Sequence, residues 1–229
     1  MTTALDRAPV DRTGSASVLR ITEIFLSIQG EARTVGLPTV FVRLTGCPLR
    51  CQYCDTTYAF WGGRPMAVAD IVGAVCGYGV DHVTVTGGEP LAQRGVHSLM
   101  SALCDAGHEV SLETSGALDV SGVDSRVSRV VDIKTPGSGE VHRNRFENLA
   151  LLDASDQIKF VICDETDYAW AKLKIDEHGL LDSDIELIFS PSADELSATD
   201  LADWIVRDRL GVRLQIQLHK ILWGDEPGR

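Results

Sequence analysis

The chain has 229 residues, of which 44% are hydrophobic, and its 33 acidic against 21 basic residues give a formal net charge of −12 at pH 7. A nucleic-acid-binding surface needs clustered Lys and Arg to displace counterions, and no stretch of the sequence supplies them, so we expect no nucleic-acid partner. No apolar run predicts a membrane span. The composition favours a folded globular protein that acts on a small molecule.

Residues 1–18 mix acidic with basic residues and lack a long apolar run. They predict a flexible N-terminal tail and not a secretory signal, which favours a cytoplasmic protein. We expect residues 19–229 to form a single domain, because a chain of this length suits one globular core.

Predicted strands and helices alternate along the chain. The strand candidates are residues 20–25, 39–46, 82–88, 108–114, 129–135, 156–162, 185–191 and 212–220. Helical patterns cover residues 68–79, 95–107 and 193–210, the last with Ser192 or Ser197 as its N-cap. Strands that alternate with helices predict a mostly parallel sheet with crossover connections.

Several predicted strands have an apolar face and a polar face. The apolar faces hold Val40, Val42 and Leu44; Val83 and Val85; Val131 and Ile133; and Leu214, Ile216 and Leu218. The opposite faces hold Phe41, Arg43 and Thr45; Thr84 and Thr86; Asp132 and Lys134; and Gln215, Gln217 and His219. Helices over the apolar faces would gather the polar faces into one lumen, which predicts an α/β fold with a partial or full βα barrel. An antiparallel sheet with one solvated face is the alternative, and the crossovers argue against it.

Three cysteines in the segment GCPLRCQYC, namely Cys47, Cys51 and Cys54, have a spacing that can hold three irons of a [4Fe–4S] cluster. The fourth iron would then lack a protein ligand and could bind a small molecule. A structural zinc site with a distant fourth ligand is the alternative, although such sites usually come as paired knuckles. The other cysteines, at positions 76, 104 and 163, stand alone in apolar stretches typical of buried thiols.

The cysteine segment, with Tyr53 before its last cysteine, and TGGEP at residues 86–90 resemble the radical S-adenosylmethionine (SAM) enzymes. The flanking motifs are EIFLSIQGE at 23–31, LETSG at 112–116, DIKTP at 132–136 and QLHKILWG at 217–224. In this order the motifs resemble the 7-carboxy-7-deazaguanine synthase family, and the resemblance rests on their combination.

The resemblance implies a partial TIM-like barrel of radical SAM type with a polar lumen. It also implies a [4Fe–4S] cluster, SAM and Mg²⁺ as cofactors, an electron donor such as flavodoxin or ferredoxin, and a homodimer. In the implied reaction, a 5′-deoxyadenosyl radical takes a hydrogen from C6 of 6-carboxy-5,6,7,8-tetrahydropterin, the ring contracts, and ammonia leaves to give 7-carboxy-7-deazaguanine. A glycyl-radical-activating enzyme and a zinc-stabilised binding module stay open as alternatives.

The resemblance also assigns substrate contacts. Ile28, Gln29 and Gly30 would hold the pterin edge, with the Gln29 amide offering a donor and an acceptor. Arg43 would bind the substrate carboxylate, since a guanidinium that faces a lumen needs an anion, and an internal Asp or Glu is the alternative partner. The further candidates are Thr86 as a substrate contact, and Glu31 and His219 as catalytic residues.

For SAM, the resemblance implies contacts from several separate motifs. They are Tyr53, Cys54, Asp55, Gly88, the ribose candidate Ser115, Asp132, Ile133, Lys134, Ser190, Pro191 and Ser192. Gly88 would let the backbone approach the ligand closely. Thr56 matches the family's Mg²⁺ position, and because one hydroxyl binds Mg²⁺ poorly, we expect waters and the substrate carboxylate to complete the site.

The sequence departs from the family pattern at two places. The first motif reads QGEA where QGEG is usual, and Ala32 would strain the loop if its φ is positive. The chain also continues through LWGDEPGR, whereas some family members end soon after the HK motif and use their last residue near the substrate. Asp225 and Arg229 are the positions concerned, and neither is assigned that contact.

Overall fold

A nine-stranded sheet forms the centre of the computed structural model, which describes residues 17–193, 195–224, 226 and 228. The strands are β1 (Val18–Ile28), β2 (Pro38–Leu44), β3 (Arg64–Ala67), β4 (His82–Gly87), β5 (Glu109–Thr114), β6 (Ser128–Asp132), β7 (Gln157–Ile162), β8 (Glu186–Pro191) and β9 (Arg213–Leu214). Residues 1–16 of the predicted tail lie outside the described part of the chain. Its last residue, Val18, already opens β1.

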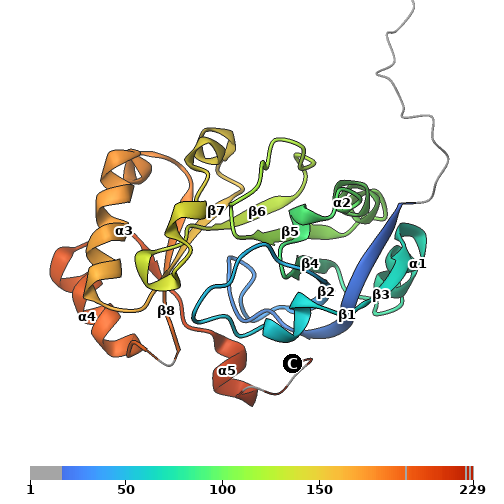
Figure 1. Cartoon of the computed structure of the whole chain (residues 1–229), viewed down its shortest axis with the longest axis horizontal. Helices are drawn as coiled ribbons and strands as arrows, with labels where there is room; N and C mark the ends of the chain where they lie inside the picture. The colour runs from blue at the N-terminus through green and yellow to red at the C-terminus, as the bar shows by residue number, and fades with distance from the viewer. Residues whose placement is uncertain (1–16, 194, 225, 227, 229) are drawn as a thin grey trace, which may run out of the picture.

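The strands run across the sheet in the order β3-β1-β2-β4-β5-β6-β7-β8-β9. From β2 to β9 every neighbouring pair is parallel, which confirms the predicted parallel sheet. The antiparallel alternative holds only for β1, which pairs with β2 and β3. Among the described residues β3 and β9 stay at opposite edges, so the curved sheet in Figure 1 is a partial barrel.

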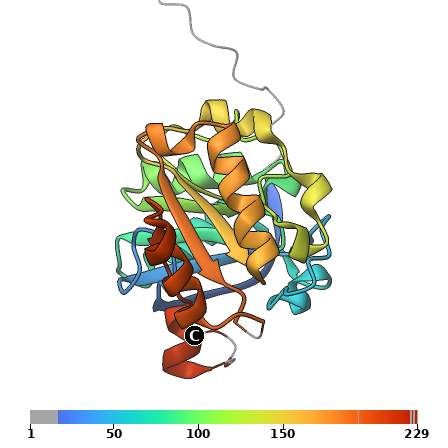
Figure 2. The same cartoon turned by 90° about the vertical axis from the view of Figure 1, so that its left-hand side faces the viewer.

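Helices cover the outer face of this sheet. They are α1 (Val68–Cys76), α2 (Val96–Asp105), α3 (Glu165–Glu177) and α4 (Ala198–Asp208). A further helix, α5 (Leu218–Trp223), follows near the C-terminus and does not belong to this layer. The 3-10 helices are η1 (Thr57–Phe60), η2 (Pro90–Ala92), η3 (Pro136–Ser138), η4 (Val141–Arg143), η5 (Phe146–Leu151) and η6 (Leu180–Asp182). Figure 2 shows α3 and α4 against β7 and β8. None of the described helices combines the length and hydropathy of a membrane span.

The predicted apolar faces form the core beneath these helices. Val40, Val42, Leu44, Val83 and Val85 pack in one cluster with residues of α1 and α2. Val131 and Ile133 pack in a second cluster with residues of α3 and α4. Full burial of one such side chain contributes about 1.5–3 kcal/mol relative to exposure. Because side chains alternate along a strand, the polar positions between these residues face the inner side of the sheet.

The helix predictions need two corrections. The stretch 193–210 becomes helical only at Ala198, and Ser197 is its N-cap, since the Ser197 hydroxyl accepts a hydrogen bond from Thr199 N across 3.2 Å. Helix α3 has no counterpart among the predictions. Its buried face includes the carboxylate of Asp167, which accepts hydrogen bonds from Thr135 and the Gly137 backbone, so the apolar stripe is interrupted.

The last predicted strand, residues 212–220, is wrong over most of its length. Strand β9 spans only Arg213–Leu214, and the chain enters α5 at Leu218. Leu214 and Ile216 are 37% and 39% exposed, so the expected apolar face does not join the core. Gln215 N still donates to Phe189 O of β8 across 2.9 Å, but regular pairing ends at Leu214, and the residue that becomes buried is Gln215.

Candidate active site

A cavity of about 770 Å³ lies on the inner side of the sheet, where the polar faces meet. Its wall includes the carboxyl ends of β2, β4, β5, β6 and β8, the edge of a parallel sheet where barrel enzymes place their active sites. Every predicted site residue lies in the described part of the chain, and all except Ile133 line this cavity. Ile133 is 1% exposed and packs in the core, so only its backbone could serve a ligand.

The cluster loop, residues 46–54, brings its three cysteines to the cavity, where their side chains are partly exposed. Burial raises the pKa of all three thiols, that of Cys51 to about 11, while the Lys134 ammonium opposes the rise. Bound iron would supply the positive charge that ionises them. Within the described residues no three His, Cys, Asp or Glu side chains lie close enough to hold one metal ion. A [4Fe–4S] cluster does not need three side chains around one metal ion, because each thiolate binds a separate iron.

The two glycines of GGEP allow the end of β4 to pack closely against the backbone at the end of β2 and the start of the cluster loop. A Cβ on Gly87 would overlap the Leu44 carbonyl, and a Cβ on Gly88 would overlap the Gly46 carbonyl. This close approach permits two backbone hydrogen bonds: Gly88 N donates to Leu44 O across 3.1 Å, and Glu89 N donates to Gly46 O across 2.8 Å. The sequence predicted that glycine permits close approach to a ligand, and the structure adds close approach to the cysteine-bearing loop.

Glu89, fully buried, fastens the end of β4 to the end of β5. Its carboxylate accepts hydrogen bonds from Thr114 Oγ1 at 2.9 Å, from Ser115 N at 2.8 Å and from Ser115 Oγ at 2.6 Å. The Ser115 hydroxyl therefore donates its proton to Glu89 and cannot donate it to a ligand at the same time. As a ribose contact, Ser115 would act through its oxygen as an acceptor.

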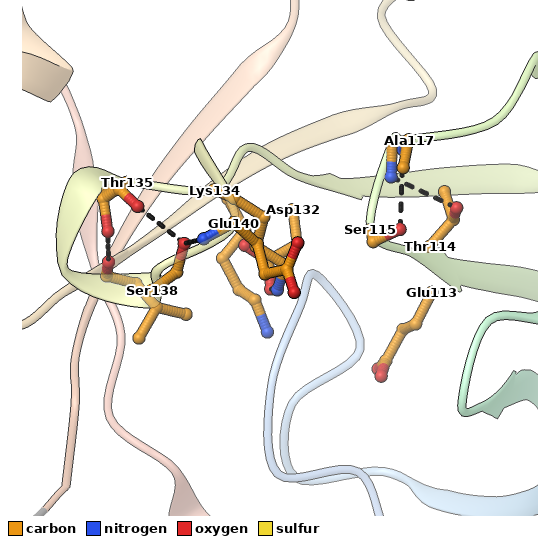
Figure 3. A network of polar contacts seen from close by, with 12 residues as sticks. Glu113, Thr114, Ser115, Ala117, Asp132, Lys134, Thr135, Ser138 and Glu140 are labelled. Carbon is orange, nitrogen blue, oxygen red and sulfur yellow. Dashed lines mark hydrogen bonds and ion pairs between the residues drawn. The ribbon is translucent and has the colours of Figure 1, made fainter. Parts of the chain in front are cut away.

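The predicted SAM side of the cavity holds two buried polar atoms without a partner, Tyr53 Oη and Asp132 Oδ1. The other Asp132 oxygen accepts from Lys134 Nζ at 2.7 Å, and that ammonium lies 5.6 Å from the centre of the Tyr53 ring. Figure 3 shows Asp132 and Lys134 together near the turn that contains Ser138. Buried polar groups are nearly always hydrogen-bonded, so these two atoms fit a polar ligand such as SAM. Ser190 and Pro191 at the end of β8, with Ser192 directly after it, complete this part of the wall.

The substrate loop, residues 28–32, begins at the last residue of β1, and its residues 28–31 line the cavity. Both ends of the Gln29 amide are engaged internally, because Nε2 donates to Thr84 Oγ1 at 3.0 Å and Oε1 accepts from Glu31 N at 3.2 Å. The sequence predicted that this amide is free to bind a pterin. In the structure it would have to share or exchange these two hydrogen bonds to do so. Ala32 has a φ of +59°, so the position where QGEG is usual does need the left-handed conformation.

Arg43 has an internal carboxylate partner, Glu23. The sequence analysis had named an internal Asp or Glu as the alternative to the substrate carboxylate. The Arg43 Nε donates to Glu23 Oε1 across 2.7 Å, while the side chain still lines the cavity. Thr56 has a similar partner, since its hydroxyl donates to Asp55 Oδ1 across 2.7 Å. Burial alone would raise the pKa of Asp55, but the Thr56 hydrogen bond and the charges of Lys220, Lys159 and Arg43 lower it. Asp55 therefore stays ionised beside Thr56.

Several charged side chains of this site had no predicted role, among them Glu113 and Lys159 in the cavity wall and Glu23, the partner of Arg43. Lys159 Nζ contacts Glu31 Oε2 at 2.7 Å, and although burial would lower the Lys159 pKa, Glu31, Asp132 and Glu113 raise it. Glu113 accepts from Thr86 Oγ1 at 3.3 Å, and Figure 3 shows its side chain projecting from β5. The signal for Lys159 was its place between Ile158 and Phe160, which puts it on the polar face of β7.

The C-terminal extension also reaches the cavity, because Gly224, Glu226 and Gly228 line it. Asp225 and Arg229, which the sequence analysis singled out, lie outside the described residues.

The chain is similar in sequence and in fold to known radical SAM proteins. The radical SAM superfamily model matches residues 41–132. A 7-carboxy-7-deazaguanine synthase of Chlorobaculum tepidum is 46% identical over 211 residues, which cover 91% of this chain and 96% of that protein. The corresponding protein of Koribacter versatilis is 41% identical over 222 residues, covering 91% and 98%. The crystal structure of QueE from Escherichia coli shares the fold, with a TM-score of 0.70 at 22% identity over 88% of this chain and 95% of that one.

The Chlorobaculum tepidum and Koribacter versatilis proteins match the chain over nearly their whole length, and both are named 7-carboxy-7-deazaguanine synthase. A radical SAM enzyme binds a [4Fe–4S] cluster and SAM, and the cysteines and the unpartnered polar atoms of the cavity fit both groups. The zinc-module and glycyl-radical alternatives receive no support from these relatives. The chain belongs to the 7-carboxy-7-deazaguanine synthase family of radical SAM enzymes.

Proposed function

We propose that this chain converts 6-carboxy-5,6,7,8-tetrahydropterin to 7-carboxy-7-deazaguanine with loss of ammonia, a step of 7-deazapurine and queuosine biosynthesis. The observation that carries the proposal is one cavity lined by the three cysteines, the substrate loop and Arg43 together. The Chlorobaculum tepidum relative, 46% identical, is named for this activity.

Bound cluster and SAM supply one-electron bond cleavage and hydrogen abstraction. The protein's task is to hold the pterin in a reactive position and to exclude competing reactions. We assign Arg43 to the substrate carboxylate, Ile28–Gly30 and Thr86 to the pterin, and Glu31 and His219 to catalysis. Lys159 and Glu113 stand beside these residues and are candidates to hold or move protons on the pterin nitrogens.

The proposal assigns the SAM contacts to Tyr53–Asp55, Gly88, Ser115, Asp132–Lys134 and Ser190–Ser192. It also includes Mg²⁺ at Thr56. The Thr56 hydroxyl and the ionised Asp55 carboxylate lie together at the cavity wall, and Mg²⁺ accepts such oxygens together with waters and a substrate carboxylate.

Several properties of the whole protein belong to the same proposal: residues 19–229 as a single domain, a homodimer, a flavodoxin or ferredoxin as electron donor, and a cytoplasmic location. A reducing compartment suits a chain whose cluster ligands are free thiols.

The test is anaerobic reconstitution with iron and sulfide, followed by incubation with SAM, a reductant and the carboxytetrahydropterin, with and without Mg²⁺. We expect a new ultraviolet-absorbing deazapurine, formed faster with Mg²⁺. SAM cleavage without any deazapurine, at saturating pterin, would exclude the proposed substrate. Equal rates with and without Mg²⁺ would exclude the metal at Thr56.

A further inference from the structure

The segment after β9 binds the backbone of the substrate loop through the side chain of Gln215. Gln215 is 6% exposed, and its amide pairs with both backbone groups of Ala32. Its Nε2 donates to Ala32 O across 2.9 Å, and its Oε1 accepts from Ala32 N across 2.6 Å. A side-chain amide thus makes the two hydrogen bonds that a neighbouring strand would make.

Ala32 depends on this support. Its φ of +59° is a conformation that residues other than glycine adopt only at a cost, and the residue is 3% exposed. Water therefore has little access to the Ala32 N–H and C=O groups, and a buried backbone group without a partner is strongly unfavourable. Without Gln215 the loop would gain by leaving this conformation.

The rest of the loop is held between the same C-terminal segment and the lumen. Leu218 N donates to Gly30 O across 3.1 Å, and Gly30 lies so close to His219 that a Cβ would overlap its ring. On the lumen side Glu31 contacts Lys159. The C-terminal segment therefore sets the orientation of the substrate loop through a backbone hydrogen bond and close packing.

We propose that Gln215 is a positioning residue for substrate binding: it holds Ala32 in the left-handed conformation that presents Gln29 and Glu31 to the pterin. This inference rests on the proposed function. Gln215 is not part of the cavity wall, so it acts through the loop and does not touch the pterin. It lies outside the motifs that carry the family resemblance, so the pattern predicted only a polar residue that faces the lumen.

The test uses Gln215→Leu, which preserves size and removes both hydrogen bonds. In the reconstituted enzyme we expect the KM for the carboxytetrahydropterin to rise about tenfold or more, since the buried Ala32 N–H loses its partner and Ala32 O keeps only the 3.4 Å bond from Val35 N. The KM for SAM and the iron content should not change. In the cluster-free protein, amide hydrogen exchange in residues 28–36 should accelerate by a similar factor.

Two further variants separate positioning from general stability. Asn148→Ala removes another buried amide, one that binds the backbone at Gly116, Leu118 and Val120, and it should lower Tm without changing the pterin KM. Ala32→Gly in the Gln215→Leu background should recover part of the pterin KM, because glycine adopts positive φ freely. A stabilising effect unrelated to the loop would instead add equally in both backgrounds.

An unchanged pterin KM, or an increase that Asn148→Ala reproduces at equal loss of Tm, would overturn the inference. If the wild-type chain makes no deazapurine, the proposed function fails. Hydrogen exchange then decides the inference alone, and unchanged exchange in residues 28–36 would overturn it.

Discussion

Arg43 and Glu23 form an ion pair at the cavity wall, with Arg43 Nε donating to Glu23 Oε1 across 2.7 Å. Tyr58 Oη donates to the same oxygen across 2.8 Å, and the guanidinium carbon lies 5.9 Å from the ring centres of both Phe25 and Tyr58. The pair fixes the guanidinium by its Nε edge. A substrate carboxylate would therefore meet the terminal Nη nitrogens, the fork that suits a bidentate contact.

Arg43→Ala should raise the KM for the carboxytetrahydropterin by about tenfold to a hundredfold, the range expected when a charge-assisted hydrogen bond is lost. Iron content and SAM binding should stay unchanged, since the cluster loop does not depend on this side chain. Steady-state kinetics with a tetrahydropterin that lacks the carboxylate supplies the control. That analogue should bind wild type and variant equally, and a variant with unaltered affinity for the carboxylated substrate would refute the role.

Cys51→Ala should abolish cluster assembly and with it SAM cleavage, because the two remaining thiolates cannot hold the cluster. The measurements are iron content, the brown absorbance of anaerobic protein and the yield of 5′-deoxyadenosine. Cys104→Ala is the matched control, since Cys104 packs beside the first core cluster, away from the cavity. Full iron loading of the Cys51 variant, or loss of iron in the Cys104 variant, would contradict the assignment.

The alternation of polar and apolar residues predicted which strand residues face the cavity, because strand side chains alternate and the helices cover one face only. Arg43, Thr86, Asp132 and Lys134 all lie where this pattern puts them. The pattern failed at residues 212–220, since alternation does not show where a strand ends, and here the chain leaves the sheet after Leu214 and enters α5 at Leu218. It also could not show the pairing of Arg43 with Glu23, which depends on the antiparallel register of β1 and β2.

Among the residues that the structure describes, two that are not glycine have positive φ, Ala32 and Arg209, and they should respond differently to glycine. Glycine removes a left-handed cost of about 1–2 kcal/mol and adds an entropic cost of about 0.5–1 kcal/mol. Arg209 is exposed, so Arg209→Gly should raise the free energy of unfolding by up to about 1.5 kcal/mol. Ala32→Gly also loses a buried methyl, worth about 0.8 kcal/mol, and should be close to neutral. Urea unfolding of cluster-free protein measures both, and a clear stabilisation by Ala32→Gly alone would contradict this balance.

Glu113 should make the stability of the protein depend on pH. Burial raises its pKa, the Glu31 carboxylate acts in the same direction, and the charges of Lys159 and Arg43 and the Thr86 hydrogen bond only partly oppose the rise. The native state therefore binds this proton more tightly than the unfolded chain. The stability that the group contributes is complete below the pKa of the unfolded glutamate and is lost as pH rises through the native pKa.

Glu113→Gln removes this dependence, because the amide resembles the protonated acid and cannot ionise. The free energy of unfolding of the variant minus that of wild type should be near zero in acid and become positive toward neutral pH. Urea titrations of cluster-free protein from about pH 4 to pH 8 measure the difference. Glu147→Gln, at an exposed position, is the matched control and should change stability by less than about 0.5 kcal/mol throughout. A difference for Glu113→Gln that stays flat or turns negative with rising pH would show that Lys159 and Arg43 outweigh the cost of burying this carboxylate.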